Sequence, residues 1–373
     1  MRFISLLSIL HGAAFIAAIP TTPTRRDDGN DTNPKCDVYK DVLSTIQTTV
    51  FENVCGDEAL DVLRIAFHDA IGFSPALNKS GQWGGGGADG SIMKFSDEEL
   101  LIDQNVGLDT SIIRLKAIAL QFVDISYGDF IYYAAAVATR MCSGPRMKFW
   151  HGRPAPIAAS PPGLIPDPSD SVTKILDRMA DAGFTPEELI DLLASHSLAV
   201  QEDVDLTIPF TPLDSTPTVL DTQFYVETLL EGTMWPGNGS NPGEAMSPFP
   251  DEFRLQSDHL LARDDRTACY WQSFIEDESV LGPRFAKAME KMSLVGQDVD
   301  SLIDCSHMVP DSVAAASVRG PHLPAGKSLA DIEASCKDRP FPTISADSGP
   351  QTSIPKPPRG NDGDDGDGAA DDD

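Results

Sequence analysis

The sequence predicts a mainly α-helical, exported protein of two lobes, with few short strands and long polar loops held by disulfides. Apolar residues recur every three to four positions in several segments, which is typical of amphipathic helices. The chain has 373 residues, more than the roughly 250–300 residues at which one hydrophobic core stops growing, so we expect two lobes. Its six cysteines follow an N-terminal export signal, and cysteines in an oxidising compartment usually pair.

Helical periodicity and capping residues give the order of the predicted helices. The clearest helix start is Thr-Pro-Glu-Glu at 185–188, in which Thr185 is an N-cap and Pro186 occupies the first helical position. Elsewhere the apolar spacing alone marks the helix, with acids on the opposite face. We expect helices over 38–54, 57–71, 108–123, 127–140, 172–182, 189–200, 221–230 and 284–294.

Glycine and proline mark the segments that join these helices. Four consecutive glycines from Gly84 make residues 74–90 a predicted loop. Residues 154–168 are proline-rich and irregular, and residues 203–218 are expected to hold short strands at most. A long irregular connection is expected before the last predicted helix.

The two ends of the chain differ in composition from the middle. Residues 1–26 have a positive start, an apolar run and small residues before a proline, which predicts a signal peptide and a short pro-segment. We expect one two-lobed domain over 27–337. Residues 338–373 form a proline-rich acidic tail, whose end at 361–373 lacks the apolar residues that a packed core needs.

The charge balance excludes several classes of partner. The chain has 28 Lys and Arg against 57 Asp and Glu, a formal net charge of -29. Nucleic acids and anionic membrane surfaces carry the same sign of charge, so neither is expected as a partner. After the export signal, no stretch approaches the length of a membrane span. The charge suits cations and neutral or cationic substrates.

The cysteines and glycosylation signals fit an exported protein. None of the six cysteines forms a CxxC pair, which argues against a zinc ribbon or a thioredoxin-type site. An even number predicts three disulfides, although sequence alone allows fifteen pairings. Three N-x-S/T sequons, at Asn30, Asn78 and Asn238, are acceptors for surface glycosylation.

Two histidines have neighbours suited to chemistry. Arg64 lies four residues before His68 in a predicted helix, so the two side chains share one face. A neutral histidine beside a permanent cation can accept a proton and stabilise developing negative charge; the alternative is a solvent-exposed Arg/His pair. His196 lies among apolar residues, where a hydrogen-bonded core histidine is the alternative to a metal ligand.

A cluster of oxygen-bearing side chains begins directly after each of these histidines. Asp69 precedes the glycine-rich loop that ends at Ser91, and Ser197 precedes the segment Leu-Asp-Ser-Thr-Pro-Thr-Val-Leu-Asp at 213–221. Carboxylates, hydroxyls and free backbone carbonyls are the ligands that calcium prefers. Each cluster alone is equally consistent with ordinary loop residues, but their duplication predicts two calcium sites.

At these motifs the chain resembles the class II secreted fungal haem peroxidases, which comprise the lignin, manganese and versatile peroxidases. The resemblance extends from about residue 36 to residue 336. It is carried by five motifs in family order: Arg-Ile-Ala-Phe-His-Asp-Ala at 64–70, the Gly84–Ser91 loop, Leu-Ala-Ser-His-Ser at 193–197, Asp-Ser-Thr-Pro at 214–217, and Leu-Gln-Ser-Asp-His at 255–259. The family fold, two helical lobes that enclose one haem b, is therefore the expected fold.

The resemblance implies how haem is held and how peroxide reacts. His196 would bind the haem iron, Asp258 would accept its Nδ1–H and strengthen it as a ligand, and Phe67 would pack beside the haem. The implied distal residues are His68, which moves the peroxide proton, Arg64, which stabilises charge as the O–O bond breaks, and Asn105, which orients His68 and is supported at the position of Glu99.

The resemblance also implies two calcium sites and three disulfides. The distal calcium would be bound by Asp69, the Gly87 carbonyl, Asp89 and Ser91. The proximal calcium would be bound by Ser197, Asp214, Thr216, the Val219 carbonyl and Asp221. The implied bridges are Cys36–Cys305, Cys55–Cys142 and Cys269–Cys336.

Two departures from the family pattern concern the reducing substrate. Lignin and versatile peroxidases have a surface tryptophan five residues before the proximal histidine, and this chain has Asp191 there. Direct oxidation of high-potential aromatics by that route is therefore not expected. Leu213 replaces the aromatic residue usual before the Asp-Ser-Thr-Pro motif, which would alter packing on the proximal side.

The family's Mn(II)-binding positions hold three carboxylates with reversed chain lengths. The family has two glutamates and one aspartate, and this chain has Asp57, Asp61 and Glu202. Carboxylates suit Mn(II), and Asp57 and Asp61 share one helix face at i,i+4. We hypothesise that Mn(II) binds here, weakly or displaced. The alternative is that these residues are three of many surface acids.

The expected function is that of a secreted, monomeric haem peroxidase with two calcium ions. It would reduce hydrogen peroxide and oxidise Mn(II), small phenols or both in one-electron steps, in the breakdown of lignin or other aromatic polymers. Three alternatives are a low-potential phenol peroxidase without a manganese site, a catalytically silent haem- or calcium-binding protein, and a metallohydrolase built on His68 and His196.

Overall fold

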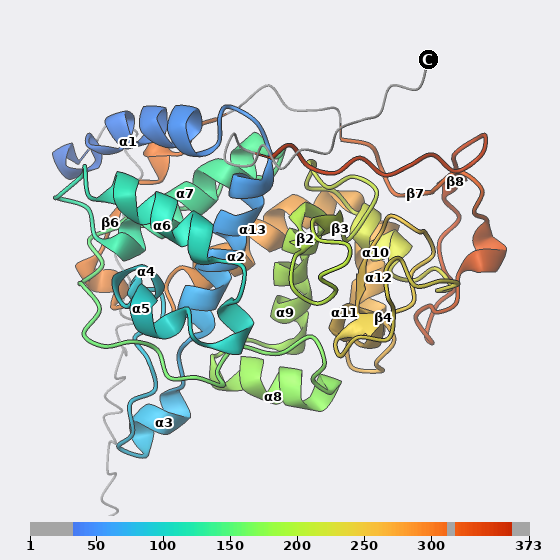
Figure 1. Cartoon of the computed structure of the whole chain (residues 1–373), viewed down its shortest axis with the longest axis horizontal. Coiled ribbons are helices and arrows are strands. Elements are labelled where there is room, and N and C mark those ends of the chain that lie inside the picture. Colours follow the sequence, from blue (N-terminus) through green and yellow to red (C-terminus); the bar gives the residue numbers. More distant parts are fainter. Residues whose placement is uncertain (1–32, 312–317, 360–373) are drawn as a thin grey trace, which may run out of the picture.

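The computed structural model describes residues 33–311 and 318–359, and its architecture is mainly helical with a few short strands (Figure 1). The predicted fold class is thereby confirmed. The predicted signal peptide and pro-segment at 1–26, the Asn30 sequon and the low-complexity end at 361–373 lie outside the described residues. Within the described ranges, the helices are all too short or too polar to cross a bilayer.

Within the described residues, the helices occur between Pro34 and Asp331. The α-helices are α1 (Tyr39–Thr45), α2 (Asp57–Ile71), α3 (Pro75–Lys79), α4 (Ser91–Lys94), α5 (Ser96–Glu99), α6 (Asp109–Ala119), α7 (Tyr127–Met141), α8 (Val172–Asp181), α9 (Pro186–Leu192), α10 (Gln223–Glu227), α11 (Gln256–Leu261), α12 (Ala268–Glu276) and α13 (Leu281–Met292). A π-helical turn, η2 (Ile46–Val50), continues α1. The 3-10 helices are η1 (Pro34–Cys36), η3 (Asp103–Asn105), η4 (Leu193–Leu198), η5 (Glu278–Val280), η6 (Val299–Ser301), η7 (Ser306–Met308) and η8 (Leu329–Asp331).

The strands are two residues long and pair into small two-stranded sheets. Three pairs are antiparallel: β1 (Trp150–His151) with β6 (Ile303–Asp304), β2 (Val200–Gln201) with β3 (Thr211–Pro212), and β4 (Glu244–Ala245) with β5 (Arg254–Leu255). The fourth pair, β7 (His322–Leu323) with β8 (Ser345–Ala346), is parallel. The short strands predicted within 203–218 are represented by β3.

The helix that carries His68 is fixed by its sequence and by its burial. Asp57 and Glu58 lie in the first turn of α2, where their charges complement the helix dipole. Apolar side chains at helical spacing bury the rest of α2 against α7, which is itself almost wholly buried. Each fully buried aliphatic side chain contributes about 1.5–3 kcal/mol relative to an exposed one. His68 therefore projects from a rigid element.

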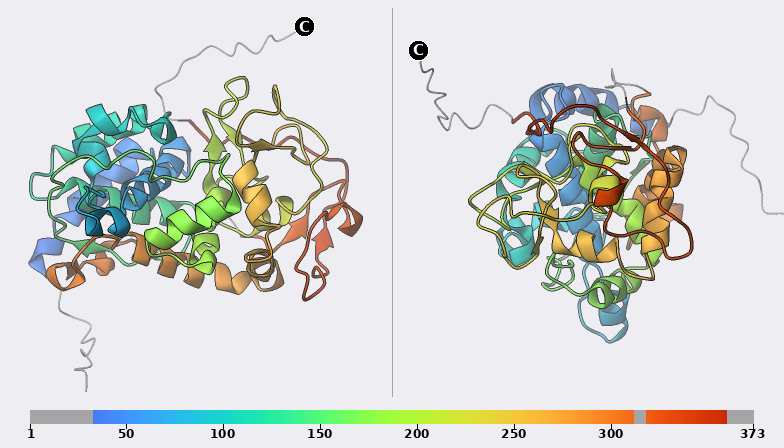
Figure 2. Two further views of the ribbon diagram at one scale, coloured as in Figure 1. Left: turned by 90° about the horizontal axis from the view of Figure 1, so that it is seen from below. Right: turned by 90° about the vertical axis from the view of Figure 1, so that its right-hand side faces the viewer.

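The two predicted lobes are arranged side by side. One holds α1, α2 and α4–α7, and the other holds β2–β4 and α10–α12 (Figures 1 and 2). Helix α13 contacts α2 of the first lobe and also contacts α9. Helix α9 lies between the lobes. One continuous cluster of buried apolar residues extends through both halves. The lobes thus share a core and hold a fixed geometry between them.

Several local predictions were wrong. The predicted loop at 74–90 contains α3, which begins because Ser74 caps it and Pro75 suits its first turn. The expected irregular connection before the last helix contains α11 and α12. The helix predicted over 189–200 ends at Leu192 and continues as the 3-10 helix η4. Tertiary contacts, which a single sequence does not display, override local propensity in these segments.

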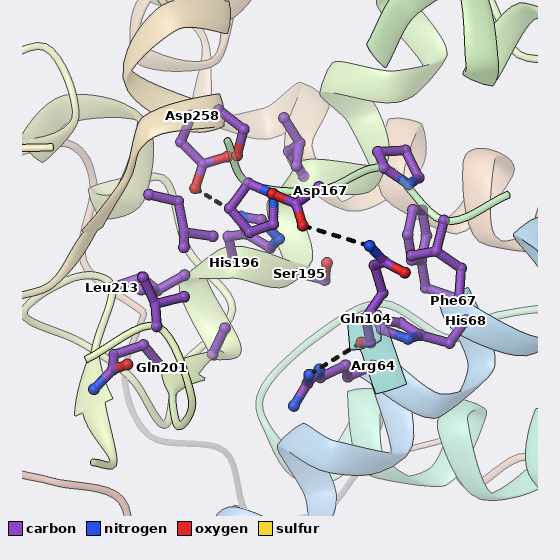
Figure 3. A pocket seen from close by; sticks show the side chains of 18 of the residues that line it. Arg64, Phe67, His68, Gln104, Asp167, Ser195, His196, Gln201, Leu213 and Asp258 are labelled. Carbon is purple, nitrogen blue, oxygen red and sulfur yellow. Dashed lines mark hydrogen bonds and ion pairs between the residues drawn. The ribbon is translucent and has the colours of Figure 1, made fainter. Parts of the chain in front are cut away.

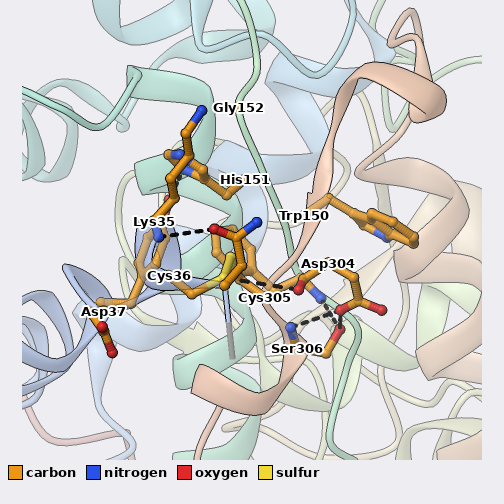
Figure 4. Close-up of a disulfide and its surroundings, with 12 residues drawn as sticks. Lys35, Cys36, Asp37, Trp150, His151, Gly152, Asp304, Cys305 and Ser306 are labelled. Atoms are coloured by element: carbon orange, nitrogen blue, oxygen red, sulfur yellow. Dashed lines mark hydrogen bonds between the residues drawn. A yellow bond between two sulfur atoms is a disulfide. The ribbon is translucent and has the colours of Figure 1, made fainter. Parts of the chain in front are cut away.

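The three disulfide pairings implied by the resemblance are confirmed. Cys36–Cys305 joins the start of the described chain to the segment after β6 (Figure 4). The other two bridges are Cys55–Cys142 and Cys269–Cys336. No cysteine in the described residues is free.

The last described residues lie along the body of the protein. The backbone N–H of Ile354 donates to Asp251 Oδ2 at 2.6 Å, and the Lys356 ammonium donates to the Pro209 carbonyl at 3.0 Å. The Pro358 carbonyl accepts from the Asp57 N–H at 2.9 Å. This part of the tail therefore ends next to the first turn of α2.

Candidate active site

A cavity of about 510 Å³ lies where α2 of one lobe faces α9, η4 and α11. Its size is in the range of small-molecule and cofactor sites. Figure 3 shows His196 and Asp258 on one side of the cavity and His68 and Phe67 on the other. Apolar side chains line much of the wall: Leu60, Leu63, Phe67, Ile175, Leu189, Leu192, Leu193, Leu198, Leu213, Leu255 and Leu261. The structure thus brings both predicted histidines to one apolar cavity.

His196 is positioned by the helix that precedes it and by a buried carboxylate. Thr185 Oγ1 accepts the Glu188 N–H at 3.2 Å and Glu188 Oε2 accepts the Thr185 N–H at 2.9 Å, a capping box that fixes the start of α9. Asp258 Oδ2 lies 2.9 Å from His196 Nδ1. This contact makes Nδ1 the protonated nitrogen, and Nε2 has no hydrogen-bond partner among the described residues.

His68 is held by an amide on the opposite side of the cavity. Its Nδ1 lies 2.7 Å from Asn105 Oδ1, and Asn105 Nδ2 donates to the backbone carbonyl of Glu99 at 2.8 Å. The predicted support at Glu99 therefore comes from its main chain, because its carboxylate accepts the Ser160 N–H instead. Burial, aided by the nearby Arg64 cation, lowers the pKa of His68 to about 3. The imidazole is neutral and can accept a proton.

Arg64 shares the helix face of His68 but is paired with acids at the cavity edge. Its guanidinium lies 3.1 Å from Glu202 Oε2 and 3.8 Å from Asp203 Oδ2. It also donates to the Val106 carbonyl at 2.8 Å. The side chain lines the cavity and is 27% exposed. Arg64 therefore connects the cavity to the acidic residues beside it.

Buried oxygen groups gather around Asp69, beside His68. Asp69 Oδ2 accepts hydrogen bonds from the Gly90 N–H and the Tyr132 hydroxyl, both at 3.0 Å. Burial, together with the neighbouring Asp89 carboxylate, raises the pKa of Asp69 well above its ordinary value. Burial likewise raises the pKa of Asp89 to about 6. The other two predicted distal calcium ligands, Gly87 and Ser91, lie in the same segment and are also buried. A divalent cation would offset the repulsion between the two carboxylates.

A second group of oxygens lies beside His196. Ser197 Oγ donates to the Val219 carbonyl at 2.9 Å, and Thr216 Oγ1 donates to Asp221 Oδ1 at 3.1 Å. Asp214 Oδ2 is buried and has no hydrogen-bond partner within residues 33–311 and 318–359. Burial and the nearby Asp221 carboxylate raise the pKa of Asp214 well above its ordinary value. A buried carboxylate oxygen with no partner is costly unless a cation binds it, so the five predicted proximal ligands fit calcium.

The three carboxylates predicted for manganese also lie together. Oxygen atoms of Asp57, Asp61 and Glu202 are all within 4.8 Å of one another. Asp61 is buried, and its Oδ2 accepts the Ser111 hydroxyl at 2.5 Å. Burial, and then the Glu202 carboxylate, raises the pKa of Asp61. Glu202 also lines the cavity, so a cation bound here would lie at the cavity edge.

Comparison with known proteins decides the family. Residues 42–277 match the Peroxidase family and residues 280–358 match the fungal peroxidase extension region. The chain belongs to the class II fungal haem peroxidases. It is 50% identical over 328 residues to Peroxidase of Arthromyces ramosus, a match that covers 87% of this chain and 89% of that protein.

Other relatives of this peroxidase are named for different kinds of peroxidase. It is 44% identical over 371 residues to Versatile peroxidase VPS1 of Pleurotus eryngii, which covers 96% of this chain and all of that protein. It is 47% identical over 321 residues to Low-redox potential peroxidase of Taiwanofungus camphoratus, covering 86% and 91% of the two chains. The enzyme is therefore a haem-dependent peroxidase, and its family membership alone does not decide between Mn(II) and phenols.

The cavity of the peroxidase fits the cofactor of its family. In peroxidases the haem iron is held by a histidine nitrogen, and the cavity offers an apolar wall and the His196 ring with Nε2 unpaired among the described residues. Leu213, the predicted departure, is part of that wall.

Sequence analysis assigned no role to three polar residues in the cavity wall. Gln104 Nε2 donates to Asp167 Oδ2 at 3.4 Å, which links η3 to the proline-rich segment 154–168 (Figure 3). Ser195 also faces the cavity. A single sequence gives no signal for the Gln104–Asp167 contact, because the two residues lie in segments without periodicity.

Proposed function

We propose that this enzyme uses hydrogen peroxide to oxidise small phenols and Mn(II), one electron at a time. The observation that carries the manganese assignment is the group of three carboxylates, whose oxygens lie within 4.8 Å of one another beside the cavity. Glu202 belongs both to this group and to the cavity wall. An electron from a cation bound there would have a short path into the cavity.

The residues on the proximal side would bind the cofactor. His196 would give Nε2 to the haem iron, and Asp258 would hold the Nδ1 proton and make the imidazole a stronger donor. When bound, haem supplies an iron centre from which peroxide can take two electrons. The Phe67 ring centroid lies 6.0 Å from that of His68, and Phe67 would pack beside the haem.

The residues on the distal side would handle the proton of the peroxide. His68 is neutral and would accept this proton and then return it to the leaving oxygen. Asn105 holds the His68 ring in one orientation through the 2.7 Å hydrogen bond to Nδ1. Arg64 would stabilise negative charge as the O–O bond breaks, which requires its guanidinium to turn from Glu202 toward the cavity.

The two oxygen clusters would bind calcium and fix the segments that follow each histidine. The distal ligands would be Asp69, Gly87, Asp89 and Ser91, and the proximal ligands would be Ser197, Asp214, Thr216, Val219 and Asp221. The partnerless Asp214 Oδ2 supports the proximal site. Three disulfides and the sequence of residues 1–26 support export, and the strongly acidic composition supports a monomer.

Substitution of the carboxylates tests the manganese assignment. Asp57→Asn and Asp61→Asn keep the size of each side chain and remove its charge, so we expect Mn(II) turnover to fall by about a hundredfold while turnover of a small phenol is retained. Steady-state assays with Mn(II) and with 2,6-dimethoxyphenol measure both. Glu98→Gln, a change at an exposed acid of α5, is the matched control. Unchanged Mn(II) turnover in both variants would contradict the assignment.

A second candidate function is that of a phenol peroxidase without a manganese site. It is favoured by the cations around the carboxylates. Arg64 is paired with Glu202. Burial raises the pKa of Asp57 and of Glu202, and Arg359 of the tail is close enough to oppose this rise in both. Two arginines would then supply the positive charge that a metal ion otherwise brings. Under this function wild-type protein would oxidise 2,6-dimethoxyphenol but not Mn(II).

A further inference from the structure

Asp191 has a redox-active partner. The Tyr270 hydroxyl, from α12, donates to Asp191 Oδ1 at 2.8 Å. Asp191 is buried, at 8% exposure, whereas Tyr270 is half-buried and reaches the surface. Burial raises the pKa of Asp191, so its carboxylate is a better proton acceptor than an exposed aspartate. A phenol at the surface is thus hydrogen-bonded to a base.

A continuous series of rings leads from Tyr270 to the proximal histidine. The Tyr270 and Phe274 centroids are 5.8 Å apart, and Phe274 stacks on Tyr225 at 4.4 Å with an interplanar angle of 12°. Tyr225 is 5.4 Å from Phe224, which is 5.6 Å from the ring of His196. Each of these separations is in the range of direct aromatic contact. Electron transfer along such a series is fast because every step is short.

The two other oxidisable side chains in or beside this series, Tyr225 and Trp271, donate their hydrogen bonds to peptide carbonyls and not to a carboxylate. The Tyr225 hydroxyl donates to the Ile190 carbonyl at 2.8 Å and the Trp271 Nε1–H donates to the Tyr225 carbonyl at 3.0 Å. Both rings are fully buried, and a peptide carbonyl does not accept a proton. A phenol or an indole that loses an electron becomes strongly acidic. The oxidised side chain is therefore stabilised where a neighbouring base can accept its proton. Among these rings that place is Tyr270.

We propose that Tyr270 is a surface oxidation site for phenols too large to enter the cavity, with Asp191 as the acceptor of its proton. The inference rests on the proposed oxidation of phenols. Tyr270 loses one electron, which moves along the rings toward His196 and replaces one of the two that hydrogen peroxide has withdrawn, and its proton moves to Asp191 Oδ1.

The cycle closes with one hydrogen atom from the substrate. A phenol at the surface gives its hydroxyl hydrogen to the Tyr270 oxygen and leaves as a phenoxyl radical, while the proton on Asp191 passes to water. Two such transfers balance each molecule of hydrogen peroxide. Tyr270 contacts the substrate and is the catalytic residue, and Asp191 acts through it.

Arg284 of α13 fits this role. Its guanidinium carbon lies 4.7 Å from the Tyr270 ring centroid and 5.0 Å from that of Phe274, and its Nη1 donates to Ser273 Oγ at 2.8 Å. A cation over the ring disfavours a positively charged tyrosine radical. Loss of the electron therefore requires loss of the proton, which makes Asp191 necessary to the step.

The experiment compares one phenol in two sizes, on haem-loaded full-length protein. Free tyramine can enter the cavity, and tyramine coupled to dextran can reach only the surface. We expect Tyr270→Phe to lower the ratio of tethered to free turnover by about tenfold or more. Tyr127→Phe, at a half-buried tyrosine of the other lobe, is the matched control and leaves the ratio unchanged. An unchanged ratio in Tyr270→Phe overturns the proposal.

A spectroscopic measurement gives a readout that is independent of turnover. Samples frozen shortly after addition of hydrogen peroxide should show a tyrosyl radical by electron paramagnetic resonance in the wild type and in Tyr127→Phe. The signal should be lost in Tyr270→Phe and weakened in Asp191→Asn, whose amide accepts the hydrogen bond but not the proton. A signal that persists in Tyr270→Phe overturns the proposal. Failure of wild-type protein to oxidise free tyramine would instead reject the proposed phenol oxidation, and the radical signal would still decide the role of Tyr270.

Discussion

His68 shows how a few contacts set the chemistry of one side chain. Its ring is buried and lies near the Arg64 cation, and both effects lower its pKa to about 3. The Asn105 amide fixes the ring through Nδ1, so Nε2 is the nitrogen available for a proton. The residue is therefore a neutral base at neutral pH.

Removal of this base should slow the reaction with peroxide. His68→Leu keeps an apolar side chain of similar size and removes proton transfer, so we expect the rate constant for the reaction with hydrogen peroxide to fall by about 10²- to 10⁴-fold. Stopped-flow absorbance of the haem-loaded enzyme measures it. His307→Gln, at an exposed histidine of η7, is the control. A rate within a few-fold of wild type in His68→Leu would contradict the role.

Helix α9 shows which parts of an element can be predicted from sequence. Its start was predicted from Thr185 and Pro186, and the structure has that cap. Its end at Leu192 was not predicted, because the apolar residues that follow keep helical spacing while tertiary contacts turn them into the 3-10 helix η4. The hydrogen bonds of Ser197 to Val219 and of His196 to Asp258 come from distant segments, and such contacts have no local signal.

The cap on α9 should have a measurable effect on stability. Thr185→Ala removes the acceptor for the Glu188 N–H, and we expect the free energy of unfolding to fall by about 1 kcal/mol. Chemical denaturation monitored by circular dichroism measures the change. Thr185→Ser retains the hydroxyl and should lose much less. Equal losses in the two variants would show that the methyl group, and not the cap, stabilises the helix.

At the scale of the whole molecule, the sequence predicted what motifs encode and missed what only the packed fold creates. The fold class, the disulfide pairing and the meeting of His68 and His196 at one cavity were all implied by the family resemblance that the motifs carry. The ion pair of Arg64 with Glu202 and the hydrogen bond of Tyr270 to Asp191 join residues far apart in the chain. No periodicity or spacing in the sequence predicts such pairs, so they can be identified only in the folded structure.

Calcium removal should loosen the whole molecule. The raised pKa of Asp214 and its partnerless oxygen indicate that the fold with its calcium sites empty carries an electrostatic cost. A ligand present at a hundred times its dissociation constant stabilises a fold by about 2.7 kcal/mol, so we expect EGTA to lower the melting temperature by about 5 °C or more.

A substitution at the proximal cluster separates this effect from general chelation. Asp214→Asn should lower the melting temperature in calcium and reduce the further drop that EGTA causes. Differential scanning calorimetry with and without EGTA measures both values. A wild-type melting temperature that EGTA does not change would rule out calcium as a structural ligand.

We propose that one haem lies between His196 and His68. A crystal structure of the haem-loaded protein tests it most directly. The prediction is electron density for haem that fills the cavity, with iron bonded to Nε2 of His196 and His68 on the opposite face without a bond to iron. Haem bound elsewhere, iron bonded to His68, or a cavity that stays filled by side chains would contradict it.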